Sequence, residues 1–248
     1  MDRITKVFYI NCWHRTDRKQ QIEEELKNNF KYDKAERLDA TVHKDALYGC
    51  TVSHVRIMQR MVQEDWDTVM VIEDDATLQV SREELDGYIN AFLDDNRADM
   101  LHIGNSCSIK KEYISSDIYT EPINRSKGDS NHADENCGCT KGGPCDGIPF
   151  YNPRFLRALN TQTSSCYIIK RNVVKPLLSC YFEEPIDTED LADITKDLPS
   201  PKRAIDVSWA AIIDKYIFLI PNVPPYGRLL VQRASYSDIS RCFADYKI

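Results

Sequence analysis

Three consecutive acidic residues are the strongest chemical signal in this sequence. Glu73-Asp74-Asp75 directly follows residues 68–72, a β-branched apolar run typical of a strand covered on both faces. Adjacent carboxylates repel one another unless a cation or hydrogen-bond donors offset their charge. Alternation along an extended chain places Glu73 and Asp75 on one side and Asp74 on the other. Because Mg²⁺ and Mn²⁺ prefer oxygen ligands and often share substrate phosphates, Glu73 and Asp75 are the predicted metal ligands. An acidic turn that caps the next helix is the alternative interpretation.

The elements that must position these acids follow an alternating pattern. Helical spacing or β-rich composition predicts strands at 6–11, 68–72, 100–104, 165–169 and 216–220, with a further short segment at 36–40, and helices at 17–30, 47–62, 85–93, 172–178 and 206–214. This alternation predicts an α/β fold with a mainly parallel central sheet. In open α/β sheets ligands bind beyond the carboxyl ends of the strands, and the three acids lie at such an end.

The length of 248 residues and the apolar content of 42% predict one large domain over residues 1–248. Within it, residues 115–153 change to an irregular composition rich in Asn, Asp, Ser, Gly, Cys and Pro. That segment is too long for an ordinary connection, so we interpret it as an insertion: a functional flap, a metal-stapled loop or a disordered segment.

The charge balance argues against nucleic acid as a partner. The chain has 39 acidic residues against 32 Lys and Arg, with a net charge of -7, and binding to phosphate backbones needs clustered cations. No apolar stretch reaches the length of a transmembrane helix. The N-terminal apolar run at residues 7–10 is too short for a signal peptide, so the sequence predicts a cytoplasmic protein.

Nine cysteines are present, and most of them are scattered singly, which favours buried thiols in a reduced compartment. Cys137, Cys139 and Cys145 form the one local group, with His132 nearby. Their spacing matches no standard zinc module, so zinc ligation, a disulfide and free loop thiols all stay open.

Four separated segments of the chain together form a recognisable pattern. They are Phe8-Tyr9-Ile10-Asn11 with Arg15-Thr16-Asp17-Arg18, Gly49-Cys50-Thr51-Val52-Ser53-His54, Val71-Ile72-Glu73-Asp74-Asp75-Ala76, and Gln232 with Ser237-Asp238-Ile239. In their order and spacing, these segments resemble glycosyltransferase family 25, the group of lipooligosaccharide and procollagen galactosyltransferases. A strand-and-helix segment at 165–178 is also similar to that family.

The resemblance implies a GT-A-type fold, a single Rossmann-like domain, and an inverting enzyme that uses a UDP-sugar, most often UDP-galactose, with Mn²⁺. It also implies a set of residues that bind the donor. Arginines suit a diphosphate because guanidinium groups match phosphate oxygens bidentately; solvated surface charges are the alternative for Arg15 and Arg18. Ser53 and His54 are expected near a helix start, where amides and an imidazole meet an anion, although His54 could equally be structural. The predicted donor-binding residues are Asn11, Arg15, Arg18, Ser53, His54, Asp74, Gln232, Ser237 and Asp238.

Asp206 is the predicted general base, since residues 204–209 resemble the family segment that carries the catalytic carboxylate. Inverting transfer needs a group to take the proton of the acceptor hydroxyl. The alternative is that Asp206 caps the following helix. Two departures from the family pattern leave the donor sugar open: Cys12-Trp13-His14 replaces a leucine and a basic residue, and Ala204 replaces a proline.

The sequence thus predicts a metal-dependent hexosyltransferase, most simply a galactosyl- or glucosyltransferase, acting on a hydroxyl of a glycan or protein. Two other classes compete with it. A metal-dependent nucleotidyltransferase or phosphohydrolase also uses strand-end acids, but no Walker-type glycine loop is present. A non-catalytic nucleotide-sugar or glycan-binding module would have no need of Glu73, Asp75 and Asp206.

Overall fold

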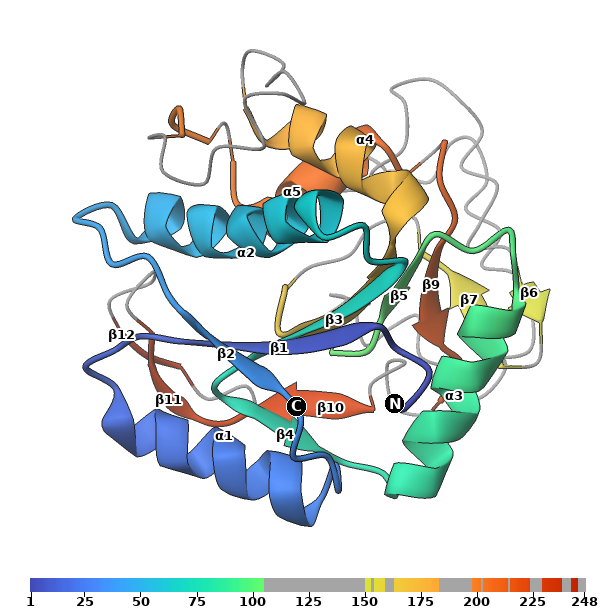
Figure 1. Cartoon of the computed structure of the whole chain (residues 1–248), viewed down its shortest axis with the longest axis horizontal. Coiled ribbons are helices and arrows are strands. Elements are labelled where there is room, and N and C mark those ends of the chain that lie inside the picture. Colours follow the sequence, from blue (N-terminus) through green and yellow to red (C-terminus); the bar gives the residue numbers. More distant parts are fainter. Residues whose placement is uncertain are drawn as a thin grey trace, which may run out of the picture.

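The computed structural model describes residues 1–104, 150–152, 154–158, 163–182, 198–201, 203–213, 215–223, 229–237 and 242–244. Most of the predicted insertion at 115–153, including Cys137, Cys139 and Cys145, lies outside these residues. The described chain forms a twisted central sheet with helices on both faces (Figure 1), as the alternating pattern predicts.

Eight strands form the central sheet, in the order β2-β1-β3-β8-β5-β9-β7-β6. Strands β1, β2 and β3 are parallel, and so are β5 and β9, whereas β8 and β7 run against their neighbours. The predicted mainly parallel sheet is confirmed, with β7 and β8 as the reversed strands. The bounds are β1 Lys6–Asn11, β2 Glu36–Asp39, β3 Thr68–Glu73, β5 Met100–His102, β6 Phe150–Asn152, β7 Phe155–Arg157, β8 Cys166–Lys170 and β9 Phe218–Pro221.

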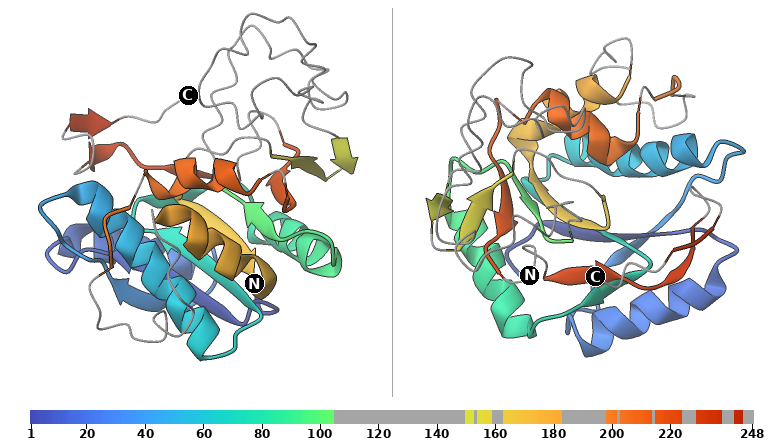
Figure 2. Two further views of the ribbon diagram at one scale, coloured as in Figure 1. Left: turned by 90° about the horizontal axis from the view of Figure 1, so that it is seen from above. Right: turned by 180° about the vertical axis from the view of Figure 1, so that it is seen from behind.

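The helices cover both faces of this sheet. Helices α2 (Ala46–Gln63), α4 (Arg171–Tyr181) and α5 (Ile205–Ser208) lie on one face, and α1 (Thr16–Asn28) and α3 (Arg82–Asp94) lie on the other (Figures 1 and 2). The predicted helix at 206–214 is shorter than expected: α5 gives way to a 3₁₀ turn over Trp209–Ala211. No helix in the described part of the chain has the length and apolar character that a membrane span requires.

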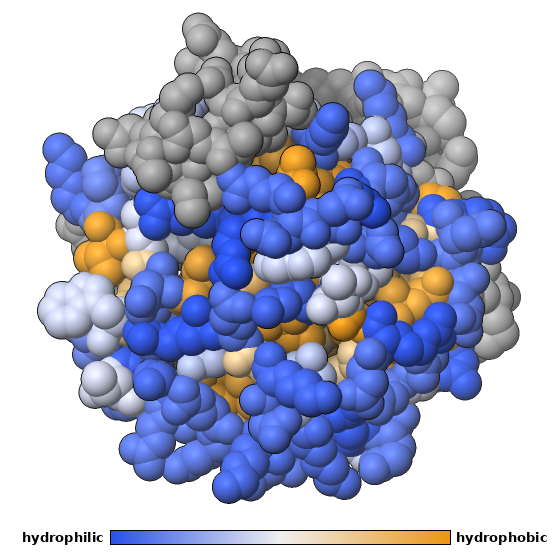
Figure 3. All heavy atoms as spheres, viewed as in Figure 1, coloured by the Kyte–Doolittle hydropathy of each residue, from blue (hydrophilic) through white to orange (hydrophobic). Residues whose placement is uncertain are grey.

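Alternation along each strand divides the core into two layers. In β1, Phe8 and Ile10 pack in the layer under α2 and α4, while Val7 and Tyr9 pack in the layer under α1 and α3. Each large apolar side chain buried in this way contributes about 1.5–3 kcal/mol. The face seen in Figure 3 is correspondingly hydrophilic, with small, separate apolar patches.

Two small antiparallel ladders lie outside the central sheet, and the sequence patterns did not predict them. Strand β4 (Ala76–Leu78) pairs with β10 (Leu230–Gln232), and β11 (Ser235–Ser237) pairs with β12 (Cys242–Ala244). Three-residue strands are too short to have a readable period. The first ladder matters for the site, since it joins the end of the chain to the acidic turn.

Candidate active site

The acidic residues occupy the tight turn between β3 and β4, at the carboxyl end of the central parallel strands. Glu73 is the last residue of β3, and its backbone N–H donates to the carbonyl of Ser165 at 2.8 Å. Asp74 and Asp75 are buried, with 6% and 9% of their surface exposed. Since burial removes the solvation of a charged carboxylate, each acid depends on the groups that surround it.

Asp74 turns toward α1 and the end of β1. Its Oδ2 accepts a hydrogen bond from Asn11 Nδ2 at 2.7 Å, and its Oδ1 accepts one from Arg18 Nη1 at 2.9 Å. Burial raises the pKa of Asp74, while the Arg18 charge and the Asn11 hydrogen bond oppose that rise. Asn11 is itself oriented by Arg37, whose Nε donates to Asn11 Oδ1 at 3.1 Å. The predicted nucleotide-binding residues Asn11 and Arg18 are therefore brought to the acids.

Glu73 is held from three directions. Ser164 Oγ donates to its Oε1 at 2.6 Å, His54 Nε2 lies 3.3 Å from the same oxygen, and Gln232 Nε2 donates to Oε2 at 3.2 Å. Burial raises the pKa of Glu73, but the contacts with His54 and Ser164 and the Arg18 charge outweigh it, so the pKa lies below its usual value. Glu73 is therefore ionised at neutral pH.

Asp75 is the least compensated of the three acids. Burial, and next the negative charge of Glu73, raise its pKa to about 7. Arg18 Nη1 lies 3.5 Å from Oδ2, and Gln232 Nε2 lies 3.4 Å from Oδ1. The same Gln232 amide thus contacts Glu73 and Asp75, which agrees with the expected placement of these two side chains on one side of the turn. Buried His102 adds no positive charge here, because burial lowers its pKa to about 3.

Gln232 reaches the acids through the β4–β10 ladder. Gln232 pairs with Ala76 in register, and the backbone N–H of Arg233 donates to the Asp75 carbonyl at 2.7 Å. Gln232, one of the predicted donor-binding residues, therefore lies beside the acidic turn. Ser237 lies in β11, which is described only as backbone, and Asp238 lies outside the described residues.

Asp206 lies in the first turn of α5, and the residue at the N-cap position is Ala204. The Oδ2 atom of Asp206 accepts the backbone N–H of Thr163 at 2.7 Å. Capping of its own helix is thus excluded as the role of this side chain. Thr163 has a positive φ of 70°, a conformation that costs a non-glycine residue roughly 1–2 kcal/mol. Asp206 stabilises that conformation from one side, and the Gly104 carbonyl, which accepts from Thr163 Oγ1 at 2.7 Å, does so from the other.

The prediction that Ser53 and His54 lie near a helix start is wrong. Both residues lie well inside α2, where backbone N–H groups are used within the helix, so these amides form no anion site. Ser53 Oγ instead donates to the Gly49 carbonyl at 2.7 Å and accepts the Thr41 N–H at 2.8 Å. Gly49 permits this close approach, because a Cβ atom there would collide with the Thr41 carbonyl. The result is a fixed helix that directs His54 at Glu73.

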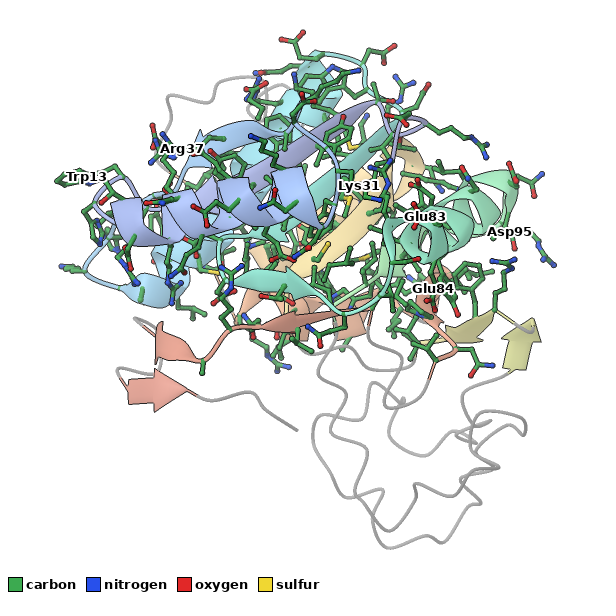
Figure 4. All side chains as sticks on the ribbon, turned by 90° about the horizontal axis from the view of Figure 1, so that it is seen from below. Trp13, Lys31, Arg37, Glu83, Glu84 and Asp95 are labelled. Atoms are coloured by element: carbon green, nitrogen blue, oxygen red, sulfur yellow. The ribbon has the colours of Figure 1, made fainter. Side chains whose placement is uncertain are left out.

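Arg15 pairs with Asp17 through its side chain and with Asn11 through its backbone. Its guanidinium donates to both Asp17 carboxylate oxygens, at 3.0 and 2.8 Å, on the exposed start of α1. Its backbone carbonyl accepts from Asn11 Nδ2 at 3.1 Å, which helps to orient the amide that holds Asp74. Trp13, in the same loop, is 69% exposed and projects from the end of the molecule where Arg37 also lies (Figure 4).

Ser164 and Tyr167 belong to the site, and sequence reasoning did not identify them. They reach Glu73 and His54 because β8 runs antiparallel to β3, with Cys166 opposite Ile72 in register, so that the start of β8 meets the end of β3. A single sequence contains no signal for the direction of a strand in a sheet. The pair Ser164-Ser165 before an apolar run was the available hint.

A protein-family model matches much of the chain. Residues 17–191 match the model of glycosyltransferase family 25 (LPS biosynthesis protein), a range that includes Arg18, His54 and the acidic turn but neither Asp206 nor Gln232. No curated protein sequence matches the chain.

Two solved structures are similar to the chain at 11% identity each. The crystal structure of A197 from STIV has a TM-score of 0.34 over 77% of this chain and 78% of that one. The apo form of mouse xyloside xylosyltransferase 1 has a TM-score of 0.35 over 86% of this chain and 72% of that one. At these TM-scores neither likeness carries an argument about the chain. The family model covers well over half of the sequence, and the protein belongs to glycosyltransferase family 25.

Proposed function

We propose that this glycosyltransferase is a metal-dependent, inverting enzyme with a GT-A-type fold. It transfers a hexose, galactose or glucose, from a UDP-sugar to a hydroxyl of a glycan or hydroxylated protein. The observation that carries the proposal is the incomplete charge compensation of the acidic turn. Arg18 lies beside Asp74 and Asp75, and His54 lies beside Glu73, yet burial and next the negative charge of Glu73 raise the pKa of Asp75 to about 7.

The carboxylate oxygens at this turn suit a hard divalent cation such as Mn²⁺. Glu73 and Asp75 offer carboxylate oxygens on the same side of the turn, and the Gln232 amide that contacts both holds them in place. Asp74 is already satisfied by Asn11 and Arg18, so Glu73 and Asp75 would hold the ion. When bound, a divalent cation would neutralise charge on the diphosphate of the donor.

The other residues have separate tasks in this proposal. Arg18, at the first turn of α1, lies beside the acids and can extend charge-assisted hydrogen bonds to a phosphate oxygen. Arg15 remains a proposed contact at the outer edge of the donor. Asp206 is the proposed base, because its Oδ2 is fixed by the Thr163 N–H while a carboxylate has further acceptor capacity. As the acceptor oxygen bonds to the anomeric carbon, the bond to the diphosphate breaks, UDP leaves and the hydroxyl proton passes to Asp206.

Release of UDP from UDP-galactose, UDP-glucose, UDP-N-acetylglucosamine and UDP-xylose, each with Mn²⁺ and with EDTA, tests the proposal. We expect turnover of a UDP-hexose in Mn²⁺ and none in EDTA. Binding of a UDP-sugar with no turnover, whichever acceptor is added, would favour the binding-module alternative. Full turnover in EDTA would reject metal dependence.

A further inference from the structure

Helix α2 presents a sulfur and a nitrogen ligand to the acidic turn. Cys50 and His54 are four residues apart and share one face of the helix, which packs against the sheet beside β3. The Cys50 Sγ, a His54 ring nitrogen and a Glu73 carboxylate oxygen all lie within 4.8 Å of one another. Three different metal-ligand types therefore converge on one point, from a rigid helix and the end of a central strand.

The separation of two of these ligands suits a tetrahedral ion. His54 Nε2 and Glu73 Oε1 are 3.3 Å apart, slightly longer than the roughly 2.7–3.2 Å that is usual for N–H···O hydrogen bonds. Nitrogen and oxygen ligands about 2.0–2.1 Å from a tetrahedral zinc ion lie roughly 3.3–3.4 Å apart. The two atoms are thus already spaced as ligands of one ion.

The outer partners of His54 and Glu73 are those that metal ligands require. Tyr167 Oη lies 2.8 Å from His54 Nδ1, the ring nitrogen that faces away from Glu73, and Ser164 Oγ donates to Glu73 Oε1 at 2.6 Å. When the Nδ1–H donates to Tyr167, Nε2 has its lone pair available for a metal. Partners of this kind fix the ring tautomer and orientation in protein metal sites.

We propose that Cys50, His54 and Glu73 bind a thiophilic divalent cation, zinc in the first instance, at a position distinct from the hard-ion position on Glu73 and Asp75. A thiolate, a carboxylate and a neutral imidazole offset the charge of such an ion. Three protein ligands leave a fourth position open. The two positions share Glu73, so a soft ion held through Cys50 competes with a hard ion held through Asp75. The site itself depends on neither UDP-sugar binding nor transfer.

Cobalt substitution tests this site directly, since a thiolate ligand gives Co²⁺ an intense charge-transfer absorption. The full-length protein would be titrated with Co²⁺ in the absence of nucleotide, as wild type and with Cys137, Cys139 and Cys145 all replaced by Ser, so that the insertion makes no contribution. We expect the band in both proteins, its loss on addition of Zn²⁺, and its loss in the Cys50→Ser variant. The matched controls are Cys180→Ser, a half-buried thiol on α4, and Asp75→Asn, and both should retain the band.

A second variant covers the case in which Cys50→Ser disturbs the fold. Tyr167→Phe keeps the ring but removes the hydroxyl that orients His54, and it should weaken Co²⁺ binding by about 10- to 100-fold. Absence of the band in the cysteine-replaced protein, or a band that Cys50→Ser leaves unchanged, would overturn the proposal. Neither result depends on whether the enzyme turns over UDP-sugars, so failure here is distinguishable from failure of the proposed function.

Discussion

Arg15 and Arg18 belong to the same family-like segment and were both predicted to bind the donor, but their surroundings differ. Arg18 lies 2.9 Å from Asp74 and 3.5 Å from Asp75, whereas Arg15 pairs with Asp17 on the exposed start of α1. Arg18 thus stabilises the turn and is also the arginine proposed to lie beside the donor, whereas the Arg15 guanidinium binds the Asp17 carboxylate. Variants of the two arginines are therefore a matched pair for testing which of them binds the donor.

We predict that Arg18→Gln raises the donor KM by roughly 10- to 150-fold, the effect of losing a charge-assisted hydrogen bond, and also lowers the melting temperature. Arg15→Gln should raise the donor KM with an unchanged melting temperature. Steady-state kinetics and thermal unfolding of both variants check this. If Arg15→Gln has the wild-type KM, Arg15 is only a surface charge. If Arg18→Gln also has the wild-type KM, the prediction that this segment binds the phosphates of the donor is wrong.

The raised pKa of Asp75 makes a pH prediction for the metal-free protein. Between the unfolded value of about 3.9 and the folded value of about 7, the folded state keeps a proton that the unfolded state has lost. The free energy of unfolding contributed by Asp75 therefore falls as pH rises through this window.

In EDTA, the stability of Asp75→Asn relative to wild type should accordingly increase from about pH 4 to about pH 7 and then level off. Mn²⁺ should stabilise wild type more than the variant, because an ion that binds only the folded state shifts the equilibrium toward it. Thermal unfolding across this pH range provides the measurement. A stability difference that does not vary with pH would show that the Asp75 carboxyl titrates normally.

Asp206 can be tested without loss of its structural contact. Asn at this position keeps an oxygen that can accept the Thr163 N–H, so Asp206→Asn removes the charge while Thr163 stays anchored. If Asp206 is the base, kcat falls by about 10²- to 10⁴-fold with near-normal donor affinity. Asp206→Ala is the comparison, and it should also lower the melting temperature. A wild-type kcat in Asp206→Asn would limit this residue to anchoring Thr163.

At the scale of elements, the β4–β10 ladder is the least predictable part that the site requires. The periodic segment 47–62 and the continuous apolar run 68–72 agree closely with α2 and β3, since their apolar residues report directly on burial. The three-residue strands β4 and β10 have no such pattern, and the reversed direction of β8, which delivers Ser164, depends on tertiary pairing. Ser53 and His54 lie in the predicted helix, but well inside it and not near its start.

This ladder leads to a prediction for the end of the chain. A truncation after Val231 keeps Leu229 and Leu230, which are fully buried, but removes Gln232 and the Arg233 N–H that binds the Asp75 carbonyl. Transfer activity should be lost while most of the cooperative thermal unfolding is retained.

The point variant Gln232→Leu separates the amide from the rest of the tail. We expect it to reduce Mn²⁺-supported turnover while the protein remains folded, because Glu73 and Asp75 lose the amide that contacts both of them. Turnover at the wild-type rate in the truncated chain would show that the tail is irrelevant to the site.

At the scale of the whole molecule, the fold explains why residues so distant in sequence meet. The parallel strands β1 and β3 end at one edge of the sheet, which brings Asn11 beside Asp74. Helices α1 and α2, on opposite faces of the sheet (Figure 1), supply Arg18 and His54 to the same turn. The family match covers residues 17–191, and the contacts of Gln232 with Glu73 and Asp75 extend the candidate site beyond that range.

Binding of UDP, measured by titration calorimetry with Mn²⁺ and with EDTA, tests the central claim most directly, because it needs no acceptor. Wild type should bind UDP in Mn²⁺ and bind it far more weakly in EDTA. Asp75→Asn should lose most of the affinity in Mn²⁺ and resemble wild type in EDTA. Equal UDP affinity in Mn²⁺ and EDTA, or an Asp75→Asn variant that binds as wild type does in Mn²⁺, would contradict a metal-dependent donor site on Glu73 and Asp75.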